Sequence, residues 1–415
     1  MKRRLWAALL LSPLAVAAGN PDLPPDALVE KALRAHPAVL AAQAGIDAGA
    51  AARDALDAGP HEFTLRLGSA QRREVATDLR LPEKQIGIER ALRLPGKAAK
   101  DGEIGAATLA QAREAYGDAL HETARLLLGS WFGWRREDAA AAEWRAQVDV
   151  LRHQNDVATK RVAAGDAARI ETLLTAAQLA QAEAQLAQAE TRAQLAAGLL
   201  SQHFPALPLP ANPGDAAPAA PAGTAEDWRE KILQHSHELQ LARNAARRAQ
   251  LQAQRSDADR LPDPTIGLNW SSERDGQERV VGVALSIPLP GAARAAAARG
   301  AQAESTAASA REALALAKVE GEARRTVQLA QTAYLQAQRL TEVAARSAEN
   351  AQLLEKAWRY GEGQLGDLLA ARRQAIEARL AAAQARLDAA EARYRLLLDA
   401  HELWAFEQES PERAP

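Results

Sequence analysis

The chain has 415 residues and a formal net charge of −2, with 51 basic and 53 acidic side chains. This balance argues against a nucleic-acid binder, because little net positive charge is available to drive binding along a phosphate backbone. The absence of cysteine excludes disulfides, thiolate metal sites and thiol catalysis. Only 4% of the residues are aromatic, and long segments rich in Ala, Glu, Arg, Gln and Leu predict long helices and coiled coils.

The N-terminus has the pattern of a secretory signal. Basic residues follow Met1, an apolar run covers residues 5–17, and small residues at 15–18 contain an Ala-x-Ala site. We therefore expect residues 1–18 to be a signal peptide that directs the chain out of the cytoplasm. No later segment has about 18 uncharged apolar residues in a row, so we expect no transmembrane helix and expect any membrane insertion to use strands.

Residues 19–203 form the first predicted structural repeat. Their patterns predict, in order, a helix, a strand, a polar loop, a second strand and a long helical hairpin. These are expected at Asp26–Ala58, Phe63–Leu67, Ser69–Lys84, Gln85–Leu94 and residues 98–203. The strand pair thus occupies residues 63–94. At about 1.5 Å per residue, the outgoing helix of the hairpin would be about 100 Å long before it turns at Gly165-Asp166.

Residues 204–224 interrupt the helical pattern. The stretch His203–Thr224 contains six prolines and predicts a linker. The same succession then recurs in a second predicted repeat, residues 225–404. Its helix, strand pair and helical hairpin are expected at Glu230–Asp259, residues 265–289 and residues 293–404. The hairpin turns at Gly361–Gly366 and returns on a heptad seam of Leu and Ala. Residues 405–415 are polar, and we expect a disordered tail.

One strand motif occurs in both repeats. Gln85–Lys97 and Val280–Ala292 each alternate with a period of two and then reach Leu-Pro-Gly before a long helix. These strand-to-helix junctions are Leu94, Pro95, Gly96, Leu289, Pro290 and Gly291. In the second copy, valine and leucine alternate with glycine, alanine and serine. An apolar face opposite a small or polar face is typical of a membrane strand between lipid and a wet lumen, although a half-buried strand of a soluble sheet has the same pattern.

Four strands cannot close a membrane barrel. Small barrels need about eight strands, and an open edge in lipid leaves backbone groups unpaired. Several chains would therefore have to share one barrel, and three chains would contribute twelve strands. The fold class predicted from these patterns is mainly α with a small β part. In it, three chains would share one 12-stranded membrane β-barrel, and the long helical hairpins would form a shared tube that projects beyond the membrane.

The order of these motifs resembles the TolC-type outer-membrane efflux proteins over the whole mature chain. The matching features are His36-Pro37, the strand-to-helix junction GVALSIPLPG, and two helix–Gly–helix tips. The tips read Arg161-Val-Ala-Ala-Gly165 and Arg359-Tyr360-Gly-Glu-Gly363, and Asp367-Leu-Leu follows the second. The Leu94–Lys97 junction and the first tip, AAGDAARIE, are most similar to the cobalt–zinc–cadmium and copper/silver branch.

The resemblance implies a trimer that forms a 12-stranded outer-membrane β-barrel plus a periplasmic α-helical barrel. This trimer would be a passive channel in a three-part, proton-driven export system that exports heavy-metal cations. Its partners would be two further copies of the chain, a periplasmic adaptor (membrane fusion) protein, an inner-membrane pump and outer-membrane lipid. Two departures from the family pattern matter. No cysteine follows the signal, so we expect no lipid anchor, and Ala370 stands where some members have an aspartate, which weakens the expectation of a second acidic ring.

The resemblance also implies that the two tips dock the adaptor and form the gate. The residues expected there are Arg161, Gly165, Asp166, Arg169, Glu171, Arg359, Tyr360, Gly363 and Asp367. Opposite charges on neighbouring helices could latch the closed state. The alternative interpretation is that Gly165 and Gly363 are turn residues with positive φ and that the charges belong to solvated helix faces.

No enzyme, cofactor or metal site is predicted. His121-Glu122 and His401-Glu402 lack the second histidine four residues later that a zinc hydrolase needs. We expect His235 and His237 to be a surface pair. Three alternatives stay open: a channel for drugs or other small molecules, a periplasmic adaptor, and a structural coiled-coil protein of the envelope. An adaptor would have one hairpin and a β-rich remainder rather than a duplicated hairpin.

Overall fold

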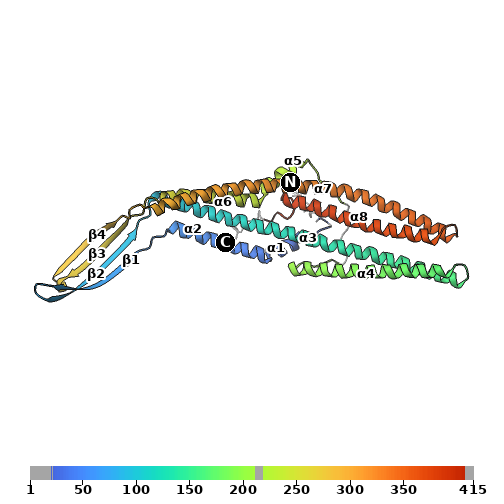
Figure 1. Ribbon diagram of the computed structural model, residues 1–415, viewed down its shortest axis with the longest axis horizontal. Coiled ribbons are helices and arrows are strands. Elements are labelled where there is room, and N and C mark those ends of the chain that lie inside the picture. Colours follow the sequence, from blue (N-terminus) through green and yellow to red (C-terminus); the bar gives the residue numbers. More distant parts are fainter. Residues whose placement is uncertain (1–19, 21, 211–217, 407–415) are drawn as a thin grey trace, which may run out of the picture. The chain divides into compact units, whose positions relative to one another are not determined.

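The computed structural model describes residues 20, 22–210 and 218–406. The expected signal peptide, the middle of the linker and all but the first two residues of the expected tail lie outside the described residues. Within the described part, two helices, two strands and two long helices occur in the same order twice (Figure 1). The first set is α1 (Asp26–Arg34), α2 (Pro37–Ala58), β1 (Thr64–Glu74), β2 (Leu79–Ala91), α3 (Pro95–Ala163) and α4 (Arg169–His203). The second is α5 (Ala225–His235), α6 (His237–Ala258), β3 (Thr265–Glu273), β4 (Glu278–Ser286), α7 (Ala292–Arg359) and α8 (Leu365–Asp399), with a 3₁₀ turn, η1 (Arg274–Gly276), between β3 and β4.

The chain divides into two compact units, and each takes segments from both halves of the sequence. The hairpin unit consists of residues 1–33, 129–220 and 333–391, and it contains the α3–α4 and α7–α8 turns. The sheet unit consists of residues 34–128, 221–332 and 392–415, and it contains all four strands. Helices α3 and α7 begin in the sheet unit and end in the hairpin unit.

The expected single helix over Asp26–Ala58 is wrong, because the chain breaks before Pro37. Proline lacks an N–H and disfavours helical backbone at the residue before it. His36 accordingly has extended angles (φ −69°, ψ 136°), and its ring accepts a hydrogen bond from the Ala38 N–H at 3.3 Å. The expected helix to Asp259 also divides into α5 and α6, at Ser236, whose hydroxyl caps α6 by accepting from the Leu239 N–H.

The four strands form one antiparallel sheet in the order β1-β2-β3-β4. The expected polar loop at Ser69–Lys84 is wrong, because β1 and β2 pair as far as Glu74 and Leu79. Charged side chains pair across this part of the hairpin, as Arg72 does with Glu83, and Leu79 and Leu81 are its only large apolar strand residues, so apolar alternation marks it only briefly. The second strand pair was expected to extend to residue 289, but β4 ends at Ser286, before the Leu-Pro-Gly junction.

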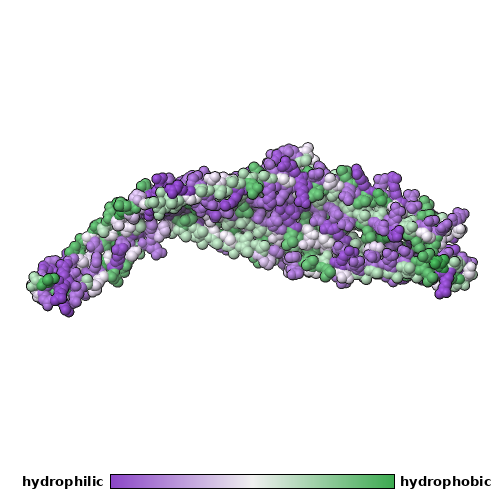
Figure 2. Space-filling model, viewed as in Figure 1, coloured by the Kyte–Doolittle hydropathy of each residue, from purple (hydrophilic) through white to green (hydrophobic). Residues whose placement is uncertain are grey.

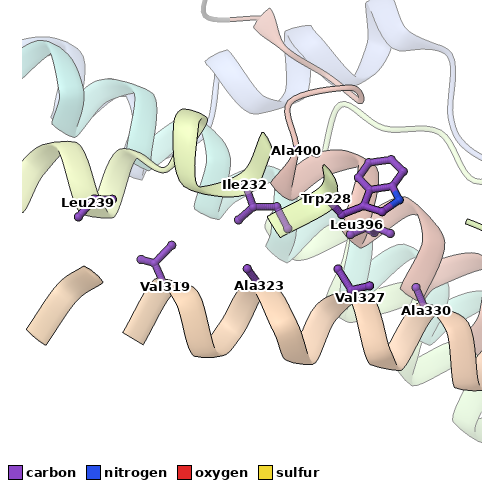
Figure 3. Packing of buried hydrophobic residues seen from close by; sticks show 9 residues of the cluster. All are labelled: Trp228, Ile232, Leu239, Val319, Ala323, Val327, Ala330, Leu396 and Ala400. Atoms are coloured by element: carbon purple, nitrogen blue, oxygen red, sulfur yellow. The ribbon is translucent and has the colours of Figure 1, made fainter. Parts of the chain in front are cut away.

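Small side chains let the helices approach closely. In the sheet unit, a core cluster joins α5 and the start of α6 to the middle of α7 and the end of α8 (Figure 3). Its members are Trp228, Ile232, Leu239, Val319, Ala323, Val327, Ala330, Leu396 and Ala400. In the hairpin unit, Ala337, Ala385 and Ala389 form a cluster between α7 and α8, and α3 packs on α4 through Val148, Leu151 and Ala182. Alanine at such positions gives long helices a seam without bulky side chains.

Candidate docking tips and an exposed apolar sheet face

The first tip is a glycine-terminated helix end. After α3, the Gly165 N–H donates to the Val162 carbonyl at 3.1 Å, and the Asp166 N–H donates to the Arg161 carbonyl at 2.9 Å. Gly165 has φ 84°. This pair of hydrogen bonds around a left-handed glycine is a Schellman motif, so the interpretation of Gly165 as a turn residue is confirmed.

The second tip repeats this geometry, but around a different glycine from the one expected. The Gly361 N–H donates to Trp358 and the Glu362 N–H to Ala357, and Gly361 has φ 79°. The turn interpretation of Gly363 is therefore wrong. Gly363 instead lies where a Cβ would come within 3.1 Å of the Ala357 side chain, so close packing is what requires a small residue there.

The sequence motif aligns Gly165 with Gly363, but the structure aligns Gly165 with a residue two positions earlier. Gly165 matches Gly361, so Arg161 matches Ala357 rather than Arg359. In the same register, Glu171 matches Asp367, and each lies in the first turn of the returning helix. A carboxylate there interacts favourably with the positive end of the helix dipole.

One contact brings the two tips together in the hairpin unit. The Arg161 guanidinium lies 4.9 Å from the centre of the Trp358 ring, a cation–π distance. Trp358 is buried in a cluster with Leu365 and Leu368 of α8. Arg161 also approaches Glu171, with 3.9 Å between the nearest charged atoms. A residue of the first turn thus covers the apolar core of the second.

The remaining tip residues point outward. Tyr360 is 82% exposed. Asp166, Arg169, Arg359 and Asp367 are also exposed, and of these Arg359 pairs with Glu355 on its own helix at 2.5 Å. The structure brings Arg161 and Glu171 together but does not bring these exposed residues to one point.

A groove beside the second tip contains residues that the sequence did not indicate. Glu355 joins Arg359 to Arg372 of α8, at 2.8 Å from Arg372, and burial lowers the pKa of Arg372. Gln154 of α3 lines the same groove, of about 410 Å³, and is only 3% exposed. Both its amide atoms lack a hydrogen-bond partner in this part of the structure. On sequence, Gln154 and Arg372 look like ordinary polar residues of a heptad.

The sheet carries an exposed apolar face. Directly paired residues lie on the same side of a sheet. The register sets apolar residues in three rows: Leu65–Ile88–Leu268–Val283, Leu67–Ile86–Trp270–Val281 and Ile266–Leu285. These side chains are between 37% and 77% exposed. A contiguous exposed apolar surface of this kind marks contact with a membrane or another protein.

The opposite face is small or polar. Its rows are Arg66–Gly87–Asn269–Gly282 and Thr64–Glu89–Gly267–Ala284. Hydrophilic side chains also gather at the end of the sheet where the strands turn, at residues 74–78 and 274–276, although Val75 among them is apolar and 93% exposed (Figure 2). The sheet therefore has one apolar side, one small or polar side and mostly polar turns.

The first strand-to-helix junction is tied by a buried charge. Lys97 is 2% exposed, and its Nζ lies 2.9 Å from Asp263 Oδ1 and 3.0 Å from Asp259 Oδ1, as an ion pair without hydrogen-bond alignment. Asp263 also accepts from the Leu94 N–H and contacts His61 at 2.9 Å. Burial acts to raise the pKa of Asp263, but Lys97, His61 and the Leu94 N–H outweigh it and lower that pKa to about 2.

The two Leu-Pro-Gly junctions differ. Pro95 is the first residue of α3, where a missing N–H costs nothing, and Gly96 follows in the first turn. Leu289, Pro290 and Gly291 instead form an exposed extended segment between β4 and α7.

Two further searches of the described residues are negative. They contain no group of three or more His, Asp or Glu side chains spaced to hold a metal ion. Among the helices described, none has a stretch both long and apolar enough to cross a membrane.

Comparison by sequence finds no matching family model and no matching curated protein. Comparison by structure finds the same fold in several channels. The Campylobacter jejuni CmeC outer membrane channel is 12% identical, with a TM-score of 0.76 over 90% of this chain and 85% of its own. CusC, described as undergoing transmembrane channel formation, is 13% identical, with a TM-score of 0.77 over 90% and 91%. The Neisseria gonorrhoeae MtrE outer membrane channel is 17% identical, with a TM-score of 0.72 over 90% and 88%. At these identities the likeness shows that the fold is shared.

Proposed function

We propose that the chain is the subunit of a passive outer-membrane channel, a homotrimer that serves a three-part efflux system. The observation that carries this proposal is the four-stranded sheet with rows of exposed apolar side chains on one face and small or polar side chains on the other. A strand between lipid and a water-filled lumen needs this division. The fold shared with CmeC, CusC and MtrE, which are described as channels, supports it.

The trimer follows from the edges of the sheet. Strands β1 and β4 each have one neighbour in the described chain, so each leaves a row of backbone N–H and C=O groups unpaired. In lipid each unpaired group would cost several kcal/mol, whereas pairing β4 of one copy with β1 of the next removes both edges. Three copies of the two structural repeats, residues 19–203 and 225–404, would supply a twelve-stranded barrel, with the paired helical hairpins forming a periplasmic tube.

The tips are the proposed docking surface for a periplasmic adaptor. Tyr360, Asp367, Asp166 and Arg169 are exposed at glycine-terminated turns whose backbone is fixed by hydrogen bonds. A rigid turn with exposed charged and aromatic side chains loses little entropy on binding. Arg161 over Trp358 is the proposed latch, because it joins the first turn to the second.

The proposed cargo is heavy-metal cations, delivered by a proton-driven inner-membrane pump. This rests on the similarity of the Leu94–Lys97 junction and the first tip to the metal-exporting branch of the family. A susceptibility panel on a strain lacking the protein tests it, with zinc, cadmium, cobalt, copper, silver and common drugs. Sensitivity to metals alone would support this cargo, and sensitivity to drugs alone would contradict it.

Adjacent positions of β4 provide the test of the channel itself. Val283 and Ala284 are both exposed, but they lie on the apolar and the polar face respectively. Val283→Lys should lose the outer-membrane trimer, because lysine facing lipid near the membrane midplane costs about 2–4 kcal/mol. Ala284→Lys should keep it. Membrane fractionation and chemical cross-linking measure both. If the two variants behave alike, or if the unaltered chain fractionates as a soluble periplasmic monomer, the proposal is wrong.

A further inference from the structure

Four of the eight histidines of the chain meet in the sheet unit. His121 comes from α3, His235 from the end of α5, His237 from the start of α6 and His401 from the turn after α8. The His401 ring centre lies 5.3 Å from that of His121, 5.2 Å from that of His235 and 5.1 Å from that of His237. The first two of these contacts are stacked. We call these four residues the histidine cluster.

The cluster corrects the expectation that His235 and His237 form a surface pair. His235 is exposed, but the His237 side chain is only 15% exposed and packs on α3. Gly117 makes room for it, since a Cβ there would lie 2.5 Å from the His237 ring. The residue that meets both histidines, His401, lies more than 160 positions away in the sequence. Sequence spacing alone could not bring the three together.

Oxygen atoms of neighbouring residues contact the rings of His237, His121 and His235. His237 Nδ1 lies 3.1 Å from Glu114 Oε2, and His121 Nε2 lies 3.4 Å from Asp399 Oδ1. His235 Nδ1 lies 2.9 Å from the Lys231 carbonyl oxygen and therefore carries the proton. The ring positions are thus set by the surrounding helices.

The stacking separates this cluster from a metal site. Ligands of one metal ion turn their nitrogens toward a common point at about 2 Å, whereas the planes of His121 and His401 are within 10° of parallel. As found for the described residues as a whole, no three of these groups have metal-site spacing. With a metal ion excluded by this geometry, the ion that these imidazoles can bind near neutral pH is the proton.

We propose that the histidine cluster is an acid-sensitive joint, which holds the α5–α6 corner and the turn after α8 against α3 while its rings are neutral and releases them when the rings become charged. An imidazole ordinarily changes charge at about pH 6.5. Stacked neutral rings attract, but several imidazolium ions at centre distances of 5.1–5.3 Å repel one another.

The charged groups around the cluster do not offset this repulsion fully. The charged groups around the cluster lie on α3, α5, α6, α7, α8 and the turn after α8. Each either lines the pocket of the cluster or pairs with a group there. They are Glu114, Asp118, Glu122, Arg125, Lys231, Glu238, Lys318, Glu322, Arg395, Asp399 and Glu402. Five of these seven carboxylates already face a base: Asp399 meets Arg125 and Arg395, Glu122 meets Arg125, Glu238 and Glu322 meet Lys318, and Glu402 meets Lys231.

The other two carboxylates are Glu114 and Asp118. Glu114 can stabilise a protonated His237, and Asp399, besides its two arginines, can stabilise a protonated His121. Burial, and then the nearby Glu122 carboxylate, raise the pKa of Asp118, whereas its proximity to His237 and His121 lowers it. When all four rings are protonated, the positive charges among these groups outnumber the carboxylates, and the His401 ring centre lies 5.1–5.3 Å from those of the other three, so the joint opens on the acid side.

The segments that would be released are short and lie at breaks in the helices. Ser236 separates α5 from α6, and His401 has φ 57°, a strained conformation for a side-chain-bearing residue. Both segments are part of the core cluster, the α5–α6 corner through Ile232 and the turn after α8 through Ala400. Opening would thus loosen the sheet unit locally, and this holds whether or not the chain is a channel.

Hydrogen exchange of the full chain in detergent tests the proposal, with mass spectrometry at about pH 7.5 and about pH 5.5 and with EDTA present. After correction for the intrinsic effect of pH, peptides covering residues 231–240 and 396–404 should exchange about tenfold faster at the lower pH. His401→Asn removes the shared ring and keeps a residue that tolerates positive φ. It should reduce the pH effect to less than about twofold.

Two further variants complete the design. His235→Gln removes an exposed ring of the cluster with the least structural cost, and it should weaken the pH effect as well. His153→Gln, an exposed histidine of α3 in the hairpin unit, should leave the effect unchanged. Equal exchange at the two pH values in the unaltered chain would overturn the proposal. So would an undiminished pH effect in both His401→Asn and His235→Gln.

Discussion

Lys97→Met should destabilise the chain by far more than the loss of an ordinary surface lysine. The ammonium is 2% exposed and lies between Asp263, whose side chain is 12% exposed, and the half-exposed Asp259. Methionine retains most of the apolar stem, so the variant removes mainly the charge. It leaves Asp263 as a nearly buried carboxylate that has lost its closest cation.

The pKa of Asp263 gives the size of the effect. Its folded value of about 2 lies below the ordinary 3.8, and at about 1.4 kcal/mol per pKa unit the difference of about 1.8 corresponds to about 2.5 kcal/mol. Because the folded pKa is lowered, this stability is present above pH 3.8 and is lost as the pH falls through about 2. Lys97 supplies the largest favourable part, and it also faces Asp259. Removing one partner of a buried pair costs about 3–5 kcal/mol, so we expect about 3 kcal/mol at neutral pH.

Denaturant unfolding of the detergent-solubilised protein, followed by helical circular dichroism, measures this change. Lys100→Met is the matched control, since Lys100 lies one turn further along α3 in a partly exposed pair with Glu103 and should cost less than about 1 kcal/mol. Asp263→Asn in the Lys97→Met background should restore part of the loss, because it removes the unpaired charge. If Lys97→Met lowers the free energy of unfolding no more than Lys100→Met does, the ion pair of Lys97 with Asp263 does not stabilise the junction.

Two glycine substitutions test backbone and packing. Gly361→Ala should destabilise the second tip by about 1 kcal/mol in thermal unfolding, because Gly361 has a positive φ. Gly366 has open space around it and an ordinary φ, so Gly366→Ala should not destabilise the tip. Equal effects would contradict the assignment of Gly361 as the turn glycine. Gly282→Ala places a Cβ 2.8 Å from Asn269 Oδ1 across β3 and β4 and should cost about 1–3 kcal/mol, measured as loss of folded protein in denaturant. Adding Asn269→Ala should recover most of this, and failure to do so would show that the strands do not have this register.

The long helices could be predicted well from the sequence. The expected helix from residue 98 to 163 is α3, Pro95–Ala163, and the one expected at about 293–358 is α7, Ala292–Arg359. Each is an alanine-rich run that contains isolated glycines but no proline after its first turn, so nothing in the sequence ends the helix earlier. The strand faces could be predicted as well, because alternation with a period of two fixes which residues point together.

The misses have separate physical causes. Pairing in the β1–β2 hairpin continues through charged residues such as Arg72 and Glu83, where only Leu79 and Leu81 mark the alternation. At the second tip, two nearby glycines fit the turn, and only the hydrogen bonds identify Gly361. The contacts of Lys97 with Asp263 and of His237 with His401 join residues more than 150 positions apart, which no local pattern encodes.

The duplicated junctions suggest how one chain keeps its own strands together. Lys97 follows β2 and reaches Asp263 ahead of β3, so it ties the two halves of the sheet at their seam. The equivalent positions at the sheet's outer edges hold Ala292 after β4 and Glu62 ahead of β1. Alanine cannot pair with a carboxylate, so in the proposed trimer a contact between β4 of one copy and β1 of the next would lack this ion pair. For copies that assemble as proposed, this asymmetry favours an order of events in which each chain first completes its own four-stranded sheet and then joins the others through backbone pairing.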